Sequence, residues 1–352
     1  MTATAKHPNA ATEGVLRPGG PLFVLSVWRS GSSLLYALLN QHPQIALLYE
    51  GDLPRLHRFL WRRFQNGSWR ERWEFWNQGP SRHGFAIDAM PAKVRDAWEA
   101  TRVIYQEVAR RKQATIWGEK TPHWHDCPLQ MAQQFPDARF IFLWRDVNAV
   151  LRSITRAAPT ERFFRKPGFT QRILVGTENL RRACDALTAQ GRPVHEISYE
   201  DLTKDPSSCM QQICRFLEIP FDERMATLDG ADRSAIASGA HHLKIRGNRI
   251  VGQKARTEVL APALQAKISR YICRWKQHHD GKWPRYPVEL PKDVRQPSRV
   301  ELWLDLLFYK ALLGRDSLVA LTYAVVPLDV ARGLRFWTRR RDRRGGLIPT
   351  SS

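Results

Sequence analysis

Short apolar stretches alternate with stretches of helical periodicity along the first two thirds of the chain. Four stretches have the length and composition of strands: residues 23–27, 115–120, 140–144 and 193–199. The stretch at 140–144 is apolar at every position, which is typical of a strand in the middle of a parallel sheet. Helical spacing of apolar residues is found at 34–39, 94–111 and 147–156. The alternation predicts an α/β fold of three layers, with helices on both sides of a central parallel sheet.

Polar residues begin where the predicted strands stop. In folds of this kind the ligand binds outside the carboxyl ends of the strands. We therefore expect the chemistry of this protein in the loops that follow Val27, Lys120, Trp144 and Tyr199.

The first of these loops, WRSGSS at 28–33, joins a strand to a leucine-rich helix. A helix N-terminus carries unpaired N–H groups and a partial positive charge, which together stabilise an anion. Gly31 would let the backbone approach that anion, the three serines Ser30, Ser32 and Ser33 would add hydroxyl donors, and Arg29 would add a forked cation. An ordinary serine-rich helix cap is the alternative interpretation.

The same loop differs from the ATP-binding Walker A sequence, GxxxxGK[ST]. No glycine stands where the first glycine of that sequence would be, and no lysine follows Gly31. A nucleoside-triphosphate kinase is therefore disfavoured, although it stays among the alternatives.

The composition adds a strong positive charge to this picture. The chain has 55 Lys and Arg residues against 34 Asp and Glu, a formal net charge of +21. This surplus attracts polyanions of any kind: nucleic acid, acidic lipid surfaces or a highly charged small ligand. The five cysteines form no CxxC pair, so we expect reduced thiols. The N-terminus lacks the apolar core of a secretory signal, and no run of 18 apolar residues marks a membrane span, so we expect a cytoplasmic protein.

The segment WRSGSSLL resembles the 5′-phosphosulfate-binding loop of the sulfotransferases that use 3′-phosphoadenosine 5′-phosphosulfate (PAPS). That family has a P-loop-like fold, so the resemblance implies the same fold here. Its second signature is an arginine followed eight residues later by a serine, which together hold the 3′-phosphate. Arg145 and Ser153 match it, directly after the stretch at 140–144. Arginine suits the role because its planar fork binds a phosphate through two hydrogen bonds. The alternative is a helix that starts at Asp146 beside an unrelated arginine.

Three further segments are similar to the family, the first of them to its bacterial and tyrosylprotein branches. GEKTP at 118–122 is similar to a G[DE]KTP element, which implies that Lys120 faces the sulfuryl group. SYEDL at 198–202 is similar to an element whose tyrosine, here Tyr199, lies near the nucleotide. HLKIRGNR at 242–249 is similar to a late basic loop that closes over the nucleotide. The contacts that it implies come from Arg246, Gly247 and Asn248.

Sulfuryl transfer to an alcohol needs a base for the hydroxyl proton and cations for the leaving phosphate. The resemblance implies Arg29 and Lys120 as the cations and Glu50, 21 residues after Arg29, as the base. The apolar run at 45–48 would desolvate the Glu50 carboxylate and raise its pKa. If Glu50 is instead a surface carboxylate at a strand end, the base would be Asp52 or a histidine. The candidate histidines are His57, His123 and His125.

No metal is expected, because the two histidines of the segment HWHD at 123–126 do not share a helical face. The family resemblance implies none either.

Domain organisation follows from the extent of the resemblance, about 21–275, and from composition. We expect a disordered tail at 1–20, a sulfotransferase domain at 21–285 and a helical extension with a basic tail at 286–352. Within the domain, 53–91 is expected to be an insertion on the acceptor side, because tryptophans and arginines interleave at 55–76. The alternative for that stretch is an amphipathic helix that packs its tryptophans into the core while its arginines reach solvent.

The helical extension has a second interpretation of its own. Apolar helical patterns begin at residue 302, and seven arginines fall within 332–344. Residues 302–344 therefore fit peripheral attachment to the anionic inner face of a membrane. The alternative is two further core helices and a solvated tail.

Taken together, these patterns predict a PAPS-dependent sulfotransferase that acts on a hydroxyl of a glycan, a lipid-linked molecule or a small alcohol, without a specific nucleic-acid partner. Two alternatives remain: a basic protein without catalysis that binds membranes or nucleic acid, and a P-loop kinase.

Overall fold

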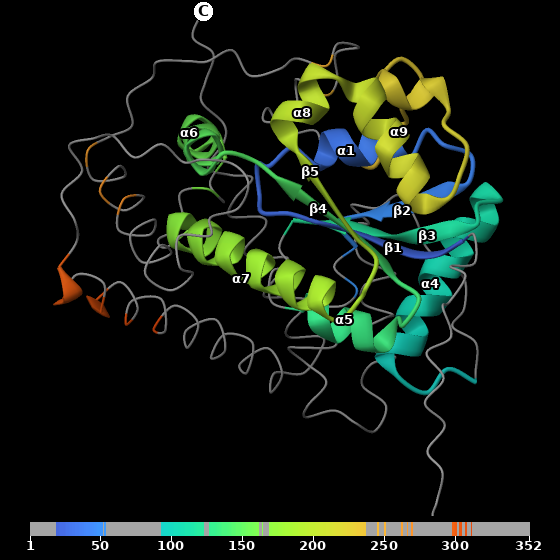
Figure 1. Cartoon of the computed structure of the whole chain (residues 1–352), viewed down its shortest axis with the longest axis horizontal. Helices are drawn as coiled ribbons and strands as arrows, with labels where there is room; N and C mark the ends of the chain where they lie inside the picture. Colours follow the sequence, from blue (N-terminus) through green and yellow to red (C-terminus); the bar gives the residue numbers. More distant parts are fainter. Residues whose placement is uncertain are drawn as a thin grey trace, which may run out of the picture.

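The computed structural model describes residues 19–51, 53, 93–122, 127–161, 164 and 169–236, with isolated positions from 245 to 311. A sheet of five parallel strands, in the order β2-β3-β1-β4-β5, lies at the centre (Figure 1). The strands are β1 (Gly20–Leu25), β2 (Ile45–Tyr49), β3 (Ile116–Thr121), β4 (Arg139–Trp144) and β5 (Val194–Ser198).

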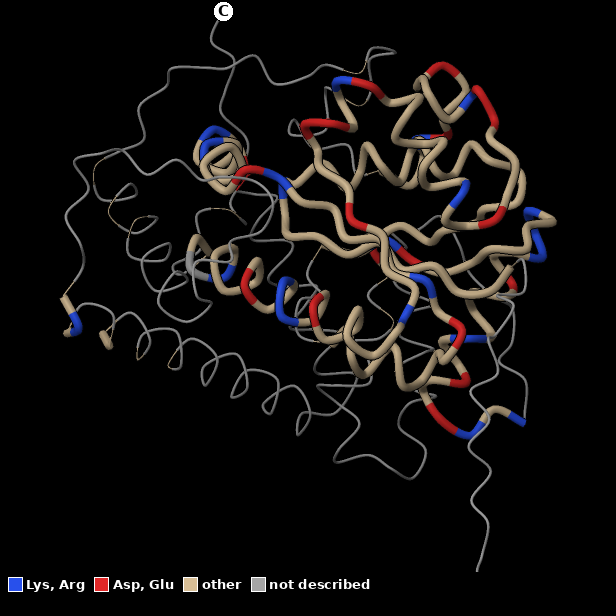
Figure 2. The backbone as a smooth tube through the Cα atoms, viewed as in Figure 1, with Lys and Arg blue, Asp and Glu red and all other residues tan. Residues whose placement is uncertain are grey.

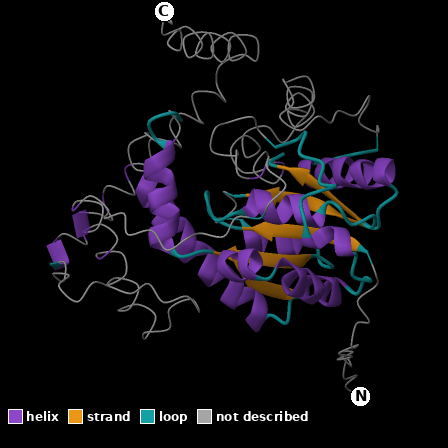
Figure 3. Ribbon diagram, turned by 90° about the horizontal axis from the view of Figure 1, so that it is seen from above, coloured by secondary structure: helices purple, strands orange, loops and turns teal. Residues whose placement is uncertain are grey.

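Helices cover both faces of this sheet (Figure 3). On one face lie α1 (Ser32–Leu39), α8 (Tyr199–Lys204), α9 (Pro206–Leu217) and the 3-10 helix η2 (Glu223–Ala226). On the other lie α4 (Ala97–Lys112), α5 (Pro128–Gln134), α6 (Val147–Ala157) and α7 (Phe169–Ala189). The predicted three-layer α/β fold with a central parallel sheet is confirmed. A loop that leads from the central strand β1 into α1 gives it the arrangement of a P-loop-like fold.

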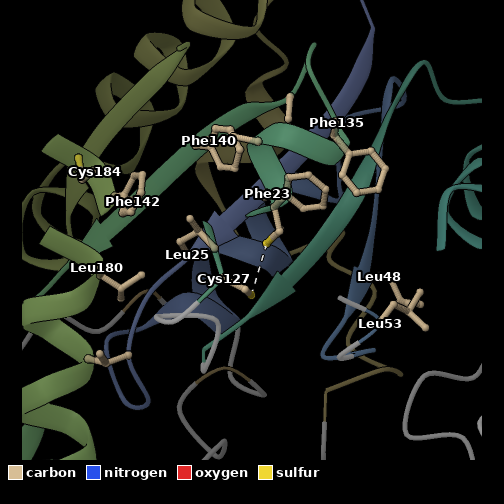
Figure 4. Packing of buried hydrophobic residues seen from close by; sticks show 14 of the residues in the cluster. Phe23, Leu25, Leu48, Leu53, Cys127, Phe135, Phe140, Phe142, Leu180 and Cys184 are labelled. Carbon is tan, nitrogen blue, oxygen red and sulfur yellow. Dashed lines mark hydrogen bonds between the residues drawn. The ribbon is translucent and has the colours of Figure 1, made fainter. Parts of the chain in front are cut away.

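Side chains that alternate along the strands build two separate cores. Phe23, Leu25, Phe140 and Phe142 point to the α7 side, where they pack with Cys184 and Leu180 (Figure 4). The residues between them on each strand, such as Val24, face α1 and α9. Because both faces are buried, β1 and β2 read as apolar runs, whereas residues of both charge signs occur along α7 (Figure 2).

The predicted strands at 115–120, 140–144 and 193–199 match β3, β4 and β5 to within one residue, whereas β2 was not among the predicted strands and the first strand differs more. The first strand was expected to reach Val27, but β1 ends at Leu25, where its pairing with Thr121 of β3 stops. Its start at Gly20 also lies inside the expected tail at 1–20. The prediction that 140–144 lies inside the sheet is confirmed, because β4 pairs with both β1 and β5.

Three helices begin at the carboxyl edge of the sheet, and they are capped differently. Asp146 accepts a hydrogen bond from the Ala149 N–H at 2.7 Å at the start of α6, and Ser198 accepts one from the Asp201 N–H at 2.8 Å at the start of α8. At α1 the N-cap is Gly31, no side chain caps the helix, and its first turn holds no acidic residue. The N-terminus of α1 is therefore left to interact with an external anion.

Candidate active site at the carboxyl edge of the sheet

The loop after β1 combines a helix N-terminus with a buried hydroxyl. Ser30 is 1% exposed, and its Oγ makes no hydrogen bond within the described part of the chain. A buried hydroxyl of this kind costs free energy unless a partner satisfies it. Together with the uncapped start of α1 at Ser32, it fits a ligand that brings hydrogen-bond acceptors.

Gly31 is required at the centre of this loop for two reasons. Its φ of 95° lies in the left-handed region, where a β-carbon is strained. A β-carbon there would also lie 2.2 Å from Cδ2 of Tyr199, the first residue of α8. The backbone of the loop is thus packed directly against the Tyr199 ring, which places the two family-like segments in contact.

Arg29, Arg145 and Ser153 also converge at this loop. The Arg29 guanidinium donates from Nε to Ser153 Oγ at 3.1 Å. Nη1 of Arg145 donates to the Arg29 carbonyl at 2.6 Å, and its guanidinium lies 4.1 Å from the centre of the Tyr199 ring. Arg145 and Asp146 form the turn from the end of β4 into the start of α6.

Burial and mutual repulsion act on these two arginines. Burial, and next the charge of Arg145, lower the pKa of Arg29 to about 10, while burial lowers the pKa of Arg145. Two partly desolvated guanidinium groups side by side are unfavourable by themselves. A bound polyanion would relieve both the desolvation and the repulsion, so this end of the site is suited to phosphate.

Lys120 and Glu50 form an ion pair at the other end of the loop. Nζ of Lys120 lies 2.7 Å from Oε1 of Glu50 and 3.5 Å from Oγ of Ser33. The Lys120 side chain is fully buried, and that burial lowers its pKa against the opposing effect of Glu50. The Glu50 N–H donates to the Lys120 carbonyl at 2.9 Å, so the β2–β3 ladder itself sets the two residues side by side.

Backbone strain is concentrated at the same place. Four described residues other than glycine have a positive φ: Arg29, Glu50, Gln113 and Glu218. Gln113 and Glu218 are the C-caps of α4 and α9, where the left-handed conformation is ordinary. Arg29 (69°) and Glu50 (50°) have no such reason, and strain of this sort accumulates at functional sites.

Two neighbouring residues were not predicted from the sequence. Tyr49 places its ring under the Lys120 ammonium and its hydroxyl 2.8 Å from Ser33 Oγ. Glu119 is fully buried on the opposite face of β3, where Tyr105 donates to it at 2.6 Å and Thr121 at 2.5 Å. Position alone was the available signal for Tyr49, since it precedes Glu50 at the same strand end.

Several predicted residues lie outside the described part of the chain: Asp52, His57, His123, His125, Arg246, Gly247 and Asn248. The acceptor-side stretch 55–76 and most of 302–344 lie outside it as well. Among the described residues, no group of three or more His, Cys, Asp or Glu side chains could hold a metal ion. No helix in that part of the chain is long and apolar enough to cross a membrane.

A comparison with known families decides between the candidate classes. The profile of the sulfotransferase family matches residues 21–223, which is more than half of the chain. The chain belongs to the sulfotransferase family. The match includes the loop after β1, the Lys120–Glu50 pair and the Arg145–Ser153 segment, and it does not favour the kinase alternative.

Within the sulfotransferase family, curated relatives are distant. Protein-tyrosine sulfotransferase A of Caenorhabditis elegans is 23% identical over 215 residues, which cover 60% of this chain and 53% of that protein. The chain thus spans about half the length of that relative. Protein-tyrosine sulfotransferase 1 of Danio rerio is 24% identical over 271 residues, which cover 75% of this chain and 69% of that protein.

Solved sulfotransferase structures have a lower sequence identity to this chain than the two relatives above. The sulfotransferase domain of the Synechococcus PCC 7002 olefin synthase has a TM-score of 0.48 and 20% identity, covering 80% of this chain and all of that one. Mouse sulfotransferase SULT7A1, in complex with PAP, has a TM-score of 0.40 and 12% identity, covering 74% and 86%. At this level of likeness, the strand order described above is what identifies the fold.

Proposed function

We propose that this protein transfers the sulfuryl group of PAPS to a hydroxyl group of an acceptor. The observation that carries the proposal is the convergence of Arg29, Arg145 and Ser153 on the loop at Gly31. A nucleotide that bears phosphate at both its 3′ and 5′ positions matches this site, because Arg145 lies at one end of the loop at Gly31 and Lys120 lies at the other. Membership of the sulfotransferase family supports the same donor.

The chain has residues that fit each charged part of PAPS. The uncapped N-terminus of α1 and the buried Ser30 hydroxyl suit the 5′-phosphosulfate, because the oxygens of an anion would accept the hydrogen bonds that both can donate. Arg145 and Ser153 suit the 3′-phosphate, and Tyr199 lies between the two ends. If the late loop closes over the nucleotide, Arg246, Gly247 and Asn248 would complete the donor site.

Glu50 and Lys120 suit the reacting end. PAPS supplies the sulfuryl group; the acceptor oxygen forms a bond to sulfur, the bond from sulfur to the phosphate oxygen breaks, and the acceptor proton passes to the Glu50 carboxylate. Lys120 has three N–H donors, of which one is directed to Glu50, so it can also stabilise charge on the leaving phosphate oxygen. Arg29, held at Ser153, is the second proposed cation.

For the acceptor, we propose only the reacting group, which is a hydroxyl. The names of the curated relatives refer to tyrosine, so a tyrosine hydroxyl in a peptide is the first acceptor to test. Glycans, lipid-linked molecules and small alcohols follow, each supplied with labelled PAPS.

Calorimetric binding of 3′-phosphoadenosine 5′-phosphate (PAP), ADP and ATP at moderate salt tests the donor assignment. We expect PAP to bind at least ten times more tightly than ADP, since ADP lacks the 3′-phosphate. Equal, weak binding of all three would mean that the net charge of +21 attracts nucleotides without specificity, and the proposal would then be abandoned.

One observation favours membrane attachment in addition to catalysis. Val300, Trp303, Leu304 and Leu307 are helical and 65%, 59%, 53% and 42% exposed. Their spacing places them on one face of a helix. Because seven arginines follow within 332–344, we propose that this face lies on an anionic membrane surface, with the enzyme at the inner face.

Vesicle co-sedimentation tests the attachment. The full chain should bind vesicles that contain phosphatidylserine and not vesicles of phosphatidylcholine alone, and Leu304→Ser should weaken the binding. Leu129→Ser, at an apolar residue of α5 that is 41% exposed, is the matched control. Retained binding by Leu304→Ser, or concentration-dependent dimerisation without vesicle binding, would overturn the proposal.

A further inference from the structure

Tyr49 contacts two functional elements at once. Its hydroxyl lies 2.8 Å from Oγ of Ser33, in the first turn of α1, and the centre of its ring lies 3.7 Å from Nζ of Lys120. The side chain is 3% exposed. The edge of the Tyr36 ring packs against it, with centroids 5.0 Å apart and planes at 71°, so the ring cannot turn freely.

The ring opposes the effect of burial on Lys120. Removal from water favours the neutral amine, and so burial lowers the pKa of Lys120. The charges that counter this are the carboxylates of Glu50, on the turn after β2, and of Glu119, on β3 itself. The negative face of an aromatic ring attracts a cation most strongly when water is absent. Tyr49 therefore adds a third favourable contact on the side of α1, without a charge of its own.

The hydroxyl of Tyr49 determines what Ser33 can do. Burial, and next the charge of Glu50, raise the pKa of Tyr49, so its hydroxyl keeps its proton. Its hydrogen bond with Ser33 fixes the position of the Ser33 hydroxyl, which Nζ of Lys120 also reaches at 3.5 Å. Ser33 is thereby held in the first turn of α1, where an external anion would bind.

We propose that Tyr49 is a positioning residue of the donor site, whose ring keeps the Lys120 ammonium charged and in place and whose hydroxyl holds the Ser33 side chain by a hydrogen bond. Ser33, held in this way, then contacts the 5′-phosphate end of the nucleotide. This inference rests on the proposed function, because it gives Lys120 and Ser33 their roles towards PAPS. Tyr49 itself does not touch the reacting atoms.

PAP binding measured by calorimetry from about pH 7 to about pH 10.5 separates the two roles of Tyr49. Tyr49→Phe removes the hydroxyl and keeps the ring; we expect affinity to fall about 5- to 20-fold with an unchanged pH midpoint. Tyr49→Leu removes both; we expect a larger loss and a midpoint about half a unit to one unit lower, because the Lys120 ammonium loses the ring. Tyr36→Phe, a buried hydroxyl next to Asn40 and outside the site, is the matched control and should bind as wild type does.

A double-mutant cycle tests the contact with Ser33 without relying on Tyr49→Leu, which could fail to fold. If Tyr49 acts through Ser33, the losses of Tyr49→Phe and Ser33→Ala should not add, and the double variant should resemble Ser33→Ala. Additive losses, or a Tyr49→Phe variant that binds PAP as wild type does, would overturn the hydroxyl role. An unshifted midpoint in folded Tyr49→Leu would overturn the ring role. Wild-type protein that fails to prefer PAP over ADP would instead refute the proposed function.

Discussion

The ammonium of Lys120 and the carboxylate of Glu50 lie 2.7 Å apart and join the carboxyl ends of β3 and β2. The lysine is fully buried, whereas the Glu50 side chain is 26% exposed, so the pair has a fixed cation and an acid that solvent or an acceptor can reach. Breaking a buried pair by removing one partner leaves an uncompensated charge. Glu50 is therefore both the counter-ion of Lys120 and the candidate base.

Glu50→Gln separates these two roles. The amide oxygen still accepts from Lys120 but cannot take a proton, so turnover should fall about 10²- to 10⁴-fold. PAP affinity near neutral pH should change far less. The measurement is sulfuryl transfer from labelled PAPS beside PAP calorimetry, with Glu223→Gln on the exposed surface as the control. Turnover close to wild type would move the base to Asp52 or a histidine.

Arg145→Ala should weaken PAP binding by about 1–3 kcal/mol, since a charge-assisted contact is lost, and should leave ADP binding nearly unchanged. Ser153→Ala should act in the same direction to a smaller extent. Calorimetry with both nucleotides measures the difference. Arg110→Ala, which removes the same charge from an exposed pair on α4, controls for net charge. An equal loss of ADP binding would remove the 3′-phosphate assignment.

Gly31→Ala should abolish PAP binding and destabilise the fold, because the new methyl group would overlap the Tyr199 ring. Gly191→Ala provides the comparison: its φ of 68° imposes similar backbone strain, but nothing lies within 4 Å. We expect the control to lose about 1–2 kcal/mol of stability in urea unfolding and to keep its PAP affinity. Similar losses of binding in both variants would contradict the Tyr199 contact.

His42 should make the fold sensitive to acid. The buried ring accepts from the Gln44 N–H through Nδ1 at 3.1 Å and donates from Nε2 to the Pro220 carbonyl at 2.9 Å, an arrangement that requires the neutral form. Burial lowers the pKa of His42 from its ordinary value of 6.5, although Asp222 opposes this and Lys112 adds to it. The unfolded chain therefore binds the proton more readily than the folded one.

The stability that neutral His42 provides should be complete above about pH 6.5 and should decline as the pH falls towards the folded pKa, by at most about 1.4 kcal/mol per pH unit. Urea unfolding of wild type and His42→Gln from about pH 4.5 to about pH 8 measures it. Burial lowers the pKa of His195 as well, and this affects both proteins alike. Parallel curves for the two proteins would refute the assignment.

The sequence was most informative for residues whose position in the folded protein also determines their residue type. A strand buried on both faces is usually rich in apolar residues, so β4 could be located from Phe140 to Trp144 alone. Arg145 and Ser153 were found because their separation of eight residues after a strand resembles the second signature of the sulfotransferase family. The convergence of these segments on Gly31 could be anticipated only because parallel strands end at the same edge.

Other features could not be read from the chain. The end of β1 at Leu25 is set by its pairing with Thr121, almost a hundred residues away. Tyr49 follows the apolar run at 45–48, and its role beside Lys120 becomes visible only in the contact between its ring and the ammonium. The direction of the Arg29 side chain towards Ser153 depends on its positive φ, which no residue type indicates.

The contact between Gly31 and Tyr199 has a consequence for synthesis on the ribosome. One wall of the loop at Gly31 is supplied by a residue 168 positions later, the first residue of α8, which directly follows the edge strand β5. A nascent chain that has not yet emerged beyond β5 lacks this wall, however well β1 and α1 are formed. If the proposed function holds, nucleotide binding therefore reports that the sheet has been completed, and a translation arrest upstream of Tyr199 should yield a product that folds in part but retains no donor.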